Sequence, residues 1–252
     1  MSDDRVIRRL IELLQRRFSN EDFQSKEKLF ELIEQVILAE TDDFLELTRI
    51  AGLSPLESYG GQNLIGVSFD RKDLARADFS NSLLIRASLI EAELSSANFS
   101  NADLTHAFLA RAKLTSANLV GANLTSVDLS GADLTNASLN NAILKMVDLS
   151  DAHCRCASIR FSDLTGAALH RVRLEEANLS SSNFRRANLS RANLQGANLF
   201  GADFTGATLY RVNFHDASLD GATVEGAHFS DNPGVSREMR RELIRRGAVF
   251  ED

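Results

Sequence analysis

Hydrophobic residues recur at every fifth position along most of the chain. From Leu64 to Phe229 every fifth residue is apolar, and all but Cys154, Ile159 and Val224 are Leu or Phe. Two residues before each lies a second restricted position, usually Ala. A period of five fits neither the 3.6-residue period of a helix nor the two-residue period of a strand. It predicts a chain that runs straight for about three residues and then turns a corner. The Leu or Phe and the small residue point inward, and the residue between them points outward.

Glycine and proline support this reading independently. All nine glycines between residues 64 and 229 lie two residues after the central Leu or Phe: Gly66, Gly121, Gly131, Gly166, Gly196, Gly201, Gly206, Gly221 and Gly226. This predicts a turn position with positive φ, as in a type II turn. The two prolines, Pro55 and Pro233, flank the repeats, where no continuous backbone ladder would be interrupted.

The repeats resemble the A(D/N)LXX motif of the pentapeptide-repeat family, as in Ala132-Asp133-Leu134 and Ala197-Asn198-Leu199, over residues 62–230. The resemblance implies a right-handed quadrilateral β-helix with four pentapeptides per coil. We therefore expect a mainly β protein with an N-terminal α-helical domain (1–59), a solenoid of about eight coils (60–231) and a C-terminal capping helix and tail (232–252). At about 4.8 Å per coil the rod would be about 40 Å long.

The inward positions vary in size along the predicted rod. Gln62 and Lys72 replace the small residue near its start, which predicts a frayed or covered first coil. Phenylalanine occupies central positions only near the two ends and not between Leu104 and Leu179. We expect these rings to plug the ends: Phe69, Phe79, Phe99, Phe184, Phe204, Phe214 and Phe229.

The flanking segments have helical periodicity. Two N-terminal apolar stripes predict three or four helices within residues 3–58: Val6, Leu10, Ile11 and Leu14, then Leu29, Leu32, Ile33, Val36 and Ile37. After the repeats, Ser236 is the expected N-cap of a helix that reaches about Arg246 and stops at Gly247. Its Met239, Leu243 and Ile244 would cover the last coil, whose unpaired edge otherwise invites aggregation.

Composition and charge restrict the functional classes. The net charge of −7 disfavours direct binding of nucleic acid. No apolar run approaches the roughly 18 residues that span a bilayer, and the first residues lack the order of a signal peptide. Two cysteines do not make a disulfide framework, so we expect a reduced, cytoplasmic protein.

The sequence offers no catalytic residues, metal site or cofactor site. Leu, Phe and Ala would fill the interior of the rod, whereas an active site needs a concave pocket with converging polar groups. The segment His153-Cys154-Arg155-Cys156 resembles a metal-binding cluster, but Cys154 falls on the inward phase and Cys156 on a turn. Because zinc needs converging ligands, we expect a core cysteine and a surface thiol instead.

Positively charged residues form a candidate partner-binding patch. Outward residues twenty apart should stack on successive coils, which puts Arg171, Arg191 and Arg211 in one column. Arg173 would lie beside this column, and Arg185 and Arg186 one face over. Stacked like charges repel, so the column predicts an anionic partner. Neutralisation by Glu175, Glu176 and Asp216 is the alternative.

A second candidate patch is apolar. Five hydrophobic residues are expected to point outward on the first coils, on adjoining faces: Ile65, Leu83, Ile85, Ile90 and Phe108. Clusters of this kind mark contact surfaces. They would receive the chain's own N-terminal helices or form a dimer or partner interface.

These features favour a non-catalytic scaffold or regulator that presents flat faces to unidentified protein partners, with a homodimer as an option. The resemblance is to cyanobacterial-type members and also implies an alternative, DNA mimicry directed at DNA gyrase. The predicted rod has 17 acidic and 15 basic residues, and most of the excess negative charge lies in the N-terminal segment. It also lacks projecting loops, which disfavours mimicry. A purely structural role is the third alternative.

Overall fold

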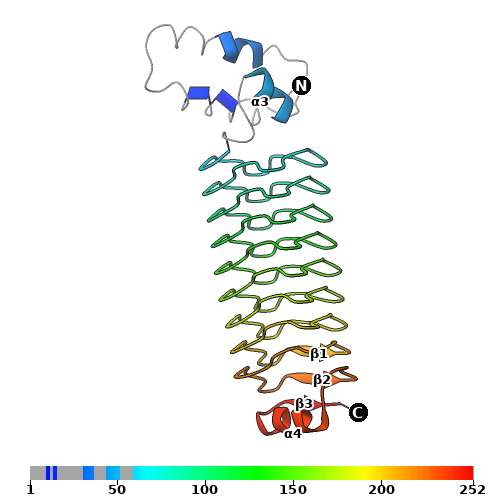
Figure 1. Cartoon of the computed structure of the whole chain (residues 1–252). Coiled ribbons are helices and arrows are strands. Elements are labelled where there is room, and N and C mark those ends of the chain that lie inside the picture. The colour runs from blue at the N-terminus through cyan, green and yellow to red at the C-terminus, as the bar shows by residue number, and fades with distance from the viewer. Residues whose placement is uncertain (1–9, 12–13, 16–30, 37–43, 52–58, 252) are drawn as a thin grey trace.

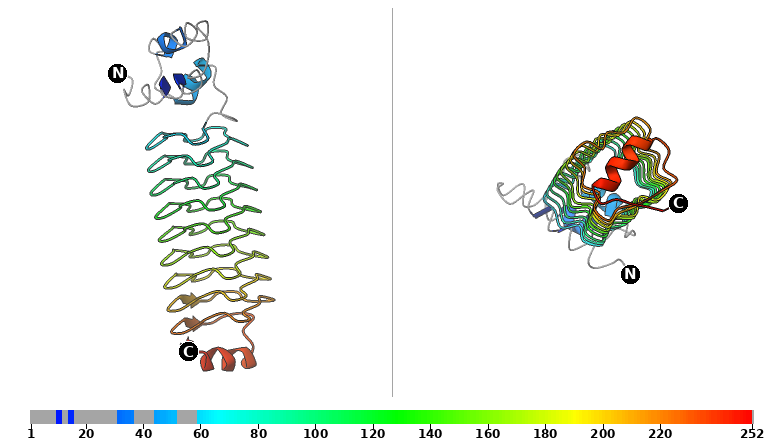
Figure 2. Two further views of the ribbon diagram at one scale, coloured as in Figure 1. Left: turned by 90° about the vertical axis from the view of Figure 1, so that its left-hand side faces the viewer. Right: turned by 90° about the horizontal axis from the view of Figure 1, so that it is seen from below.

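A four-sided rod of stacked coils makes up most of the molecule (Figure 1). The computed structural model describes residues 10–11, 14–15, 31–36, 44–51 and 59–251. The backbone has a positive φ at every fifth residue from Gly61 to Asp231, whether or not that residue is glycine. Seen from below, the coils superimpose (Figure 2). The predicted corner in each pentapeptide is therefore confirmed.

A continuous parallel ladder joins each coil to the next. Residues pair with those twenty positions later, from Asn63 with Leu83 to Asp203 with Thr223. Near the end the ladder widens into three named parallel strands, β1 (Thr208–Tyr210), β2 (His228–Ser230) and β3 (Val249–Phe250). This register of twenty residues gives four pentapeptides per coil.

We number the four faces in chain order. In the second coil, faces 1 to 4 carry the inward residues Leu84, Leu89, Leu94 and Phe99, and each face repeats every twenty residues. The two residues that follow each inward residue form the turn at the edge between one face and the next. Edge 4/1, for example, leads from face 4 of one coil to face 1 of the next.

The turns explain why Asp and Asn recur between the two inward residues. In one repeat, the Leu104 carbonyl accepts a hydrogen bond from Ala107 N–H at 2.8 Å, and the third turn residue, His106, has a φ of 58°. This is type II geometry. The Asp103 carboxylate accepts a hydrogen bond from Thr105 N–H at 3.0 Å. It thereby satisfies the one backbone N–H of turn residues 104–107 that makes no hydrogen bond to another backbone group of the described residues.

The interior is filled along its whole length. The inward Leu, Phe and Ala residues are buried in one continuous cluster. Near the ends, aromatic rings stack from coil to coil, with Phe79 on Phe99 at 4.9 Å and Phe184 on Phe204 at 5.0 Å between ring centroids. Tyr59 adds a ring above Phe79 at 5.1 Å, whereas Gln62 at the first coil is only half-buried.

Helical residues lie at the N-terminal end of the rod (Figure 1). They include α3 (Phe44–Ile50) and residues 31–36. Leu10, Leu47 and their buried neighbours belong to the same apolar cluster as the rod. The other positions of the two predicted stripes that fall within 1–9, 12–13, 16–30 and 37–43 lie outside the described residues. Within the described ranges, no helix is long and apolar enough to cross a membrane.

Helix α4 (Arg237–Arg245) lies across the C-terminal end of the rod (Figure 2). As predicted, Ser236 is its N-cap and accepts from Met239 N–H at 3.1 Å. Leu243 is buried, but Ile244 is exposed, so the prediction that Ile244 covers the last coil is wrong. The crossing of α4 turns that side chain towards solvent.

Strand β3 was not anticipated from the sequence. It pairs with β2, and its Phe250 stacks on Phe229 with ring centroids 4.9 Å apart. The five-residue period has ended by this point, so no repeat signal marks the strand.

Candidate interaction surfaces

The rod interior offers no space for a reacting group. No group of three metal-ligating side chains occurs among the described residues. Cys154 is buried, as its inward phase predicts, and burial raises the pKa of its thiol to about 12. Cys156 is exposed and donates to the Glu176 carboxylate at 3.4 Å, and this hydrogen bond raises the pKa of the Cys156 thiol. One sulfur is in the core and the other at the surface, so they do not form a common ligand pair.

Large exposed hydrophobic side chains gather around face 1. Of those that the structure describes within the rod, Leu83 and Ile143 lie on face 1 itself. Phe161 and Phe200 lie on edge 4/1, and Met146 lies on edge 1/2. Phe108, on neighbouring face 2, is the sixth. We call the residues Leu83, Ile143, Met146, Phe161 and Phe200 the face 1 apolar surface.

Three members of this surface are the most exposed large hydrophobic residues that the structure describes within the rod. Met146, Phe161 and Phe200 expose 64%, 55% and 58% of their surfaces. Met146 and Phe161 also have φ values of 56° and 58°, a conformation that glycine adopts at lower energy. The Arg160 guanidinium lies 5.1 Å from the centre of the Phe161 ring and covers only part of it. The rod therefore keeps bulky apolar groups at turn positions that would accept glycine.

The apolar patch expected from the sequence is only partly exposed, and it shares Leu83 with the face 1 apolar surface. Leu83 and Phe108 are exposed, whereas Ile65, Ile85 and Ile90 are half-buried. Sequence reasoning missed Ile143, Met146, Phe161 and Phe200 because they are scattered over 58 residues. Assigning each outward and turn residue to its face or edge of the twenty-residue coil would have shown that all four lie on or beside face 1.

The six arginines divide between two sides of the rod. Arg171, Arg191 and Arg211 stack on edge 2/3 with Arg173 on face 3, while Arg185 belongs to the turn after face 1 and Arg186 follows it. Arg173, Arg186 and Arg191 have no ion pair among the described residues.

The expected neutralising residues are not the ones that pair with the arginine column. Arg171 makes two hydrogen bonds of 2.6 Å to the Asp151 carboxylate, and Arg211 lies 3.6 Å from Asp231. The hydrogen bonds from Arg171 lower the pKa of Asp151. Glu176 pairs instead with Arg155 at 3.0 Å. Asp151 lies one coil before Arg171, and Asp231 lies one coil after Arg211. Each carboxylate therefore occupies the same column of turn residues as the arginine that it neutralises.

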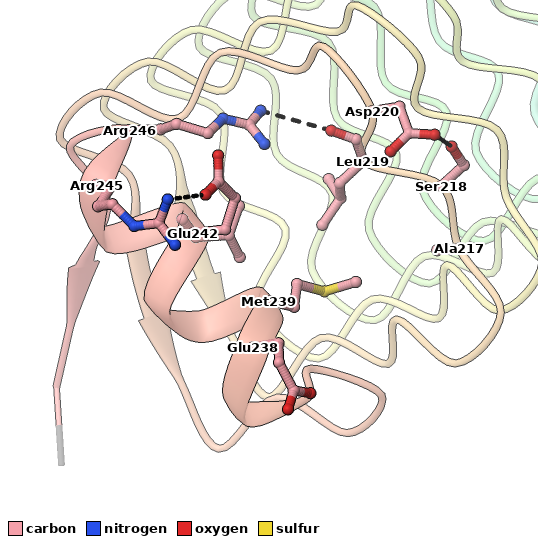
Figure 3. A pocket seen from close by; sticks show the side chains of 10 residues that line it. Ala217, Ser218, Leu219, Asp220, Glu238, Met239, Glu242, Arg245 and Arg246 are labelled. Carbon is pink, nitrogen blue, oxygen red and sulfur yellow. Dashed lines mark hydrogen bonds and ion pairs between the residues drawn. The ribbon is translucent and has the colours of Figure 1, made fainter.

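A groove of about 610 Å³ separates the last turn of face 4 from α4 (Figure 3). Leu219, Met239 and Leu243 provide apolar lining, and Met239 extends from the helix into this space. Asp220, Glu238 and Glu242 provide carboxylates at its border. Sequence reasoning did not identify this groove, because it depends on where α4 packs.

Comparisons with known proteins agree with this architecture. Eight copies of the family model for pentapeptide repeats match the chain, spanning residues 63–231. The structure is similar to HetL, a pentapeptide repeat protein involved in heterocyst differentiation regulation from the cyanobacterium Nostoc sp. strain PCC 7120. The match has 32% identity and a TM-score of 0.50, and it covers 67% of this chain and 83% of HetL.

A second solved structure shares the fold alone. QnrB1, a plasmid-mediated fluoroquinolone resistance protein, matches with 19% identity and a TM-score of 0.57, over 75% of this chain and 97% of its own. No curated protein sequence matches the chain.

Proposed function

The chain belongs to the pentapeptide-repeat family, and we propose that it is a non-catalytic scaffold or regulator that binds a protein partner through face 1. The family fold is the right-handed quadrilateral β-helix, in agreement with the four-sided coils of the rod. A solid core of this kind supplies rigid flat faces rather than a pocket for substrate.

The observation that carries the proposal is the face 1 apolar surface. Exposed apolar clusters on one side of a protein mark contact sites, and aromatic and Met residues are enriched in the centres of interfaces. Phe161 and Met146 stand at positive φ, where a bulky residue costs backbone free energy that glycine would avoid. Every non-glycine residue at this turn position bears that cost, so the exposure of these two apolar side chains, rather than their φ, supports a contact role.

Similarity to HetL supports a regulatory role, because that protein is involved in regulating heterocyst differentiation. We propose the same class of role here, with the N-terminal helical residues and α4 covering the two ends of the rod. The buried and free thiols fit the proposed reducing, cytoplasmic setting.

The arginines would supply a secondary contact. Arg173, Arg186 and Arg191, without ion pairs among the described residues, would meet acidic residues of the partner. Arg171 and Arg211 are already engaged by Asp151 and Asp231, so the column as a whole is less basic than its sequence suggests. Mutating Arg191 to Ala should weaken binding at low salt and reduce its salt dependence.

The test compares two full-length variants with the wild type as bait in a lysate of the source organism. In the first, four residues of the face 1 apolar surface become Ser: Ile143, Met146, Phe161 and Phe200. In the matched control, four outward residues of face 3 that lie outside the proposed arginine contact become Ser: Lys113, His153, Asn193 and Asn213. Circular dichroism first establishes that both variants are folded.

A partner retained by the wild type and the face 3 control, but lost with the face 1 variant, would support the proposal. Equal capture by all three baits would contradict it. Gyrase among the retained proteins would instead favour DNA mimicry, and no specific protein with any bait would favour a structural role. Light scattering of the purified chain tests the homodimer.

A further inference from the structure

The backbone ladder prepares every coil to receive another strand. On face 4, Leu199 N–H and Gly201 N–H donate to the carbonyls of Ser218 and Asp220, both at 2.9 Å. In return, the Ala197 carbonyl accepts from Ser218 N–H at 3.1 Å. Two donors and one acceptor per face thus point towards the C-terminal end of the rod.

At the last coil, three of the four faces find a partner for at least one of these groups. Face 2 continues into β3. On face 3, Phe214 N–H donates to the Pro233 carbonyl at 2.8 Å. On face 1, Gly226 N–H donates to the Gly247 carbonyl at 2.8 Å, and the Arg246 guanidinium donates to the Ala222 carbonyl. The C-terminal segment therefore protects part of each of these three edges.

Face 4 alone receives no partner for any of its three groups. Within the described part of the chain, Leu219 N–H, Gly221 N–H and the Ala217 carbonyl make no hydrogen bond. The groove beside α4 lies along this same edge and is lined by Ala217, Ser218 and Leu219 (Figure 3). The face 4 edge therefore combines these unpaired backbone hydrogen-bonding groups with an adjoining apolar groove.

We propose that this edge binds an extended segment of a partner protein as an additional strand of the rod. The three groups have the spacing of the ladder itself, which only an extended backbone matches. The segment would donate one N–H to the Ala217 carbonyl and place two carbonyls against Leu219 N–H and Gly221 N–H. This is strand addition, in which main-chain bonds give affinity and side-chain pockets give specificity.

The lining of the groove defines the chemistry of the segment. An apolar side chain would pack on Leu219 beside Met239 and Leu243, as Leu219 packs within the core. Of the bordering carboxylates, Glu242 is paired with Arg245 at 2.7 Å.

The other two carboxylates, on Asp220 and Glu238, have no ion pair among the described residues. The guanidinium of Arg246 is turned to backbone carbonyls. A basic residue within two or three positions of the apolar one therefore fits the border.

The probe is a capped synthetic peptide with the sequence of residues 186–191, Arg-Ala-Asn-Leu-Ser-Arg. It has the small–Asn–Leu order of the rod and basic ends. Amide hydrogen exchange of the full chain, resolved by NMR, is followed at Leu219 and Gly221, with Leu199 and Gly201 as internal references. In the free protein we expect Leu219 and Gly221 to exchange at least about tenfold faster than the references, and saturating peptide should slow them by about tenfold or more.

Two controls separate strand addition from general binding. A peptide with proline in place of its asparagine lacks the N–H meant for Ala217 and should give no protection. The variant Asp220→Lys with Glu238→Lys should weaken peptide binding about tenfold, whereas Asp216→Lys, outside the groove, should not. The face 1 Ser variant should bind the peptide normally, so the outcome is independent of the proposed face 1 function.

Three results would overturn the proposal. Leu219 and Gly221 could exchange as slowly as Leu199 and Gly201 in the free protein, which would show that the edge is closed. The proline peptide could protect them as well as the original peptide. Protection that rises with protein concentration in the absence of peptide would assign the edge to a second copy of the chain rather than to a partner segment.

Discussion

Proline should have opposite effects at two adjacent turn positions, Ala110 and Arg111. In this turn Ala112 N–H donates to the Leu109 carbonyl at 3.0 Å, and Arg111 has a φ of 57°. Ala110 N–H makes no hydrogen bond among the described residues. Ala110 is therefore the second residue of a type II turn, where proline is favoured.

The magnitudes follow from these contacts. Ala110→Pro loses no backbone hydrogen bond and restricts the unfolded chain, so we expect a gain of about 0.4–1 kcal/mol in the free energy of unfolding. Arg111→Pro removes the bond from Arg111 N–H to the Ser130 carbonyl, 2.9 Å long. Proline also cannot reach a φ of 57°, so the loss should be at least about 3 kcal/mol.

Thermal and urea unfolding, followed by circular dichroism, measure both variants. The control Arg111→Ala removes the side chain and its exposed ion pair with Glu91 but keeps the N–H. It should lose much less stability than Arg111→Pro. If Ala110→Pro destabilises the rod as strongly as Arg111→Pro, this account of the turn is refuted.

Three further predictions concern the core and the titrating groups. Leu124→Ala should destabilise the rod by about 2–5 kcal/mol, because it opens a cavity in a filled interior; an unchanged unfolding midpoint would contradict this. Iodoacetamide should label Cys156 in the native protein and leave Cys154 unmodified until unfolding, which peptide mass mapping would show; native labelling of Cys154 would contradict its burial. The pKa values of Asp133 and Asp163 are lowered overall: partial burial raises them, but hydrogen bonds from the threonine two residues later outweigh it. These two carboxylates therefore stabilise the folded protein above pH 3.8, and this stabilisation is lost as the pH falls through their pKa values in the folded state. In the Asp133→Asn variant, the melting temperature should fall less steeply with decreasing acidic pH than in the wild type.

The repeating unit of the rod is encoded locally in the sequence. The five-residue period alone is enough to assign the inward Leu and Ala phases, the turn position of Gly121 and the burial of Cys154. The reason is that both the turn conformation and the direction of each side chain are set within five residues. Even the stacking of rings such as Phe184 on Phe204 follows once four repeats make one coil.

The surfaces that the repeats create depend instead on how the coils stack. Ile143, Phe161 and Phe200 lie far apart in sequence, and only the register of twenty residues brings them to one side. The same register places Asp151 against Arg171, a pairing that is hidden by the closeness of Glu175 and Glu176 in the sequence.

The five-residue repeat ends before the C-terminal segment, so it does not predict how that segment packs. The packing of α4 and β3 leaves Ile244 facing solvent and the edge at Leu219 open. Local periodicity fixes a direction within each coil, but partners across coils and at the end of the rod depend on long-range packing, which five-residue patterns do not encode.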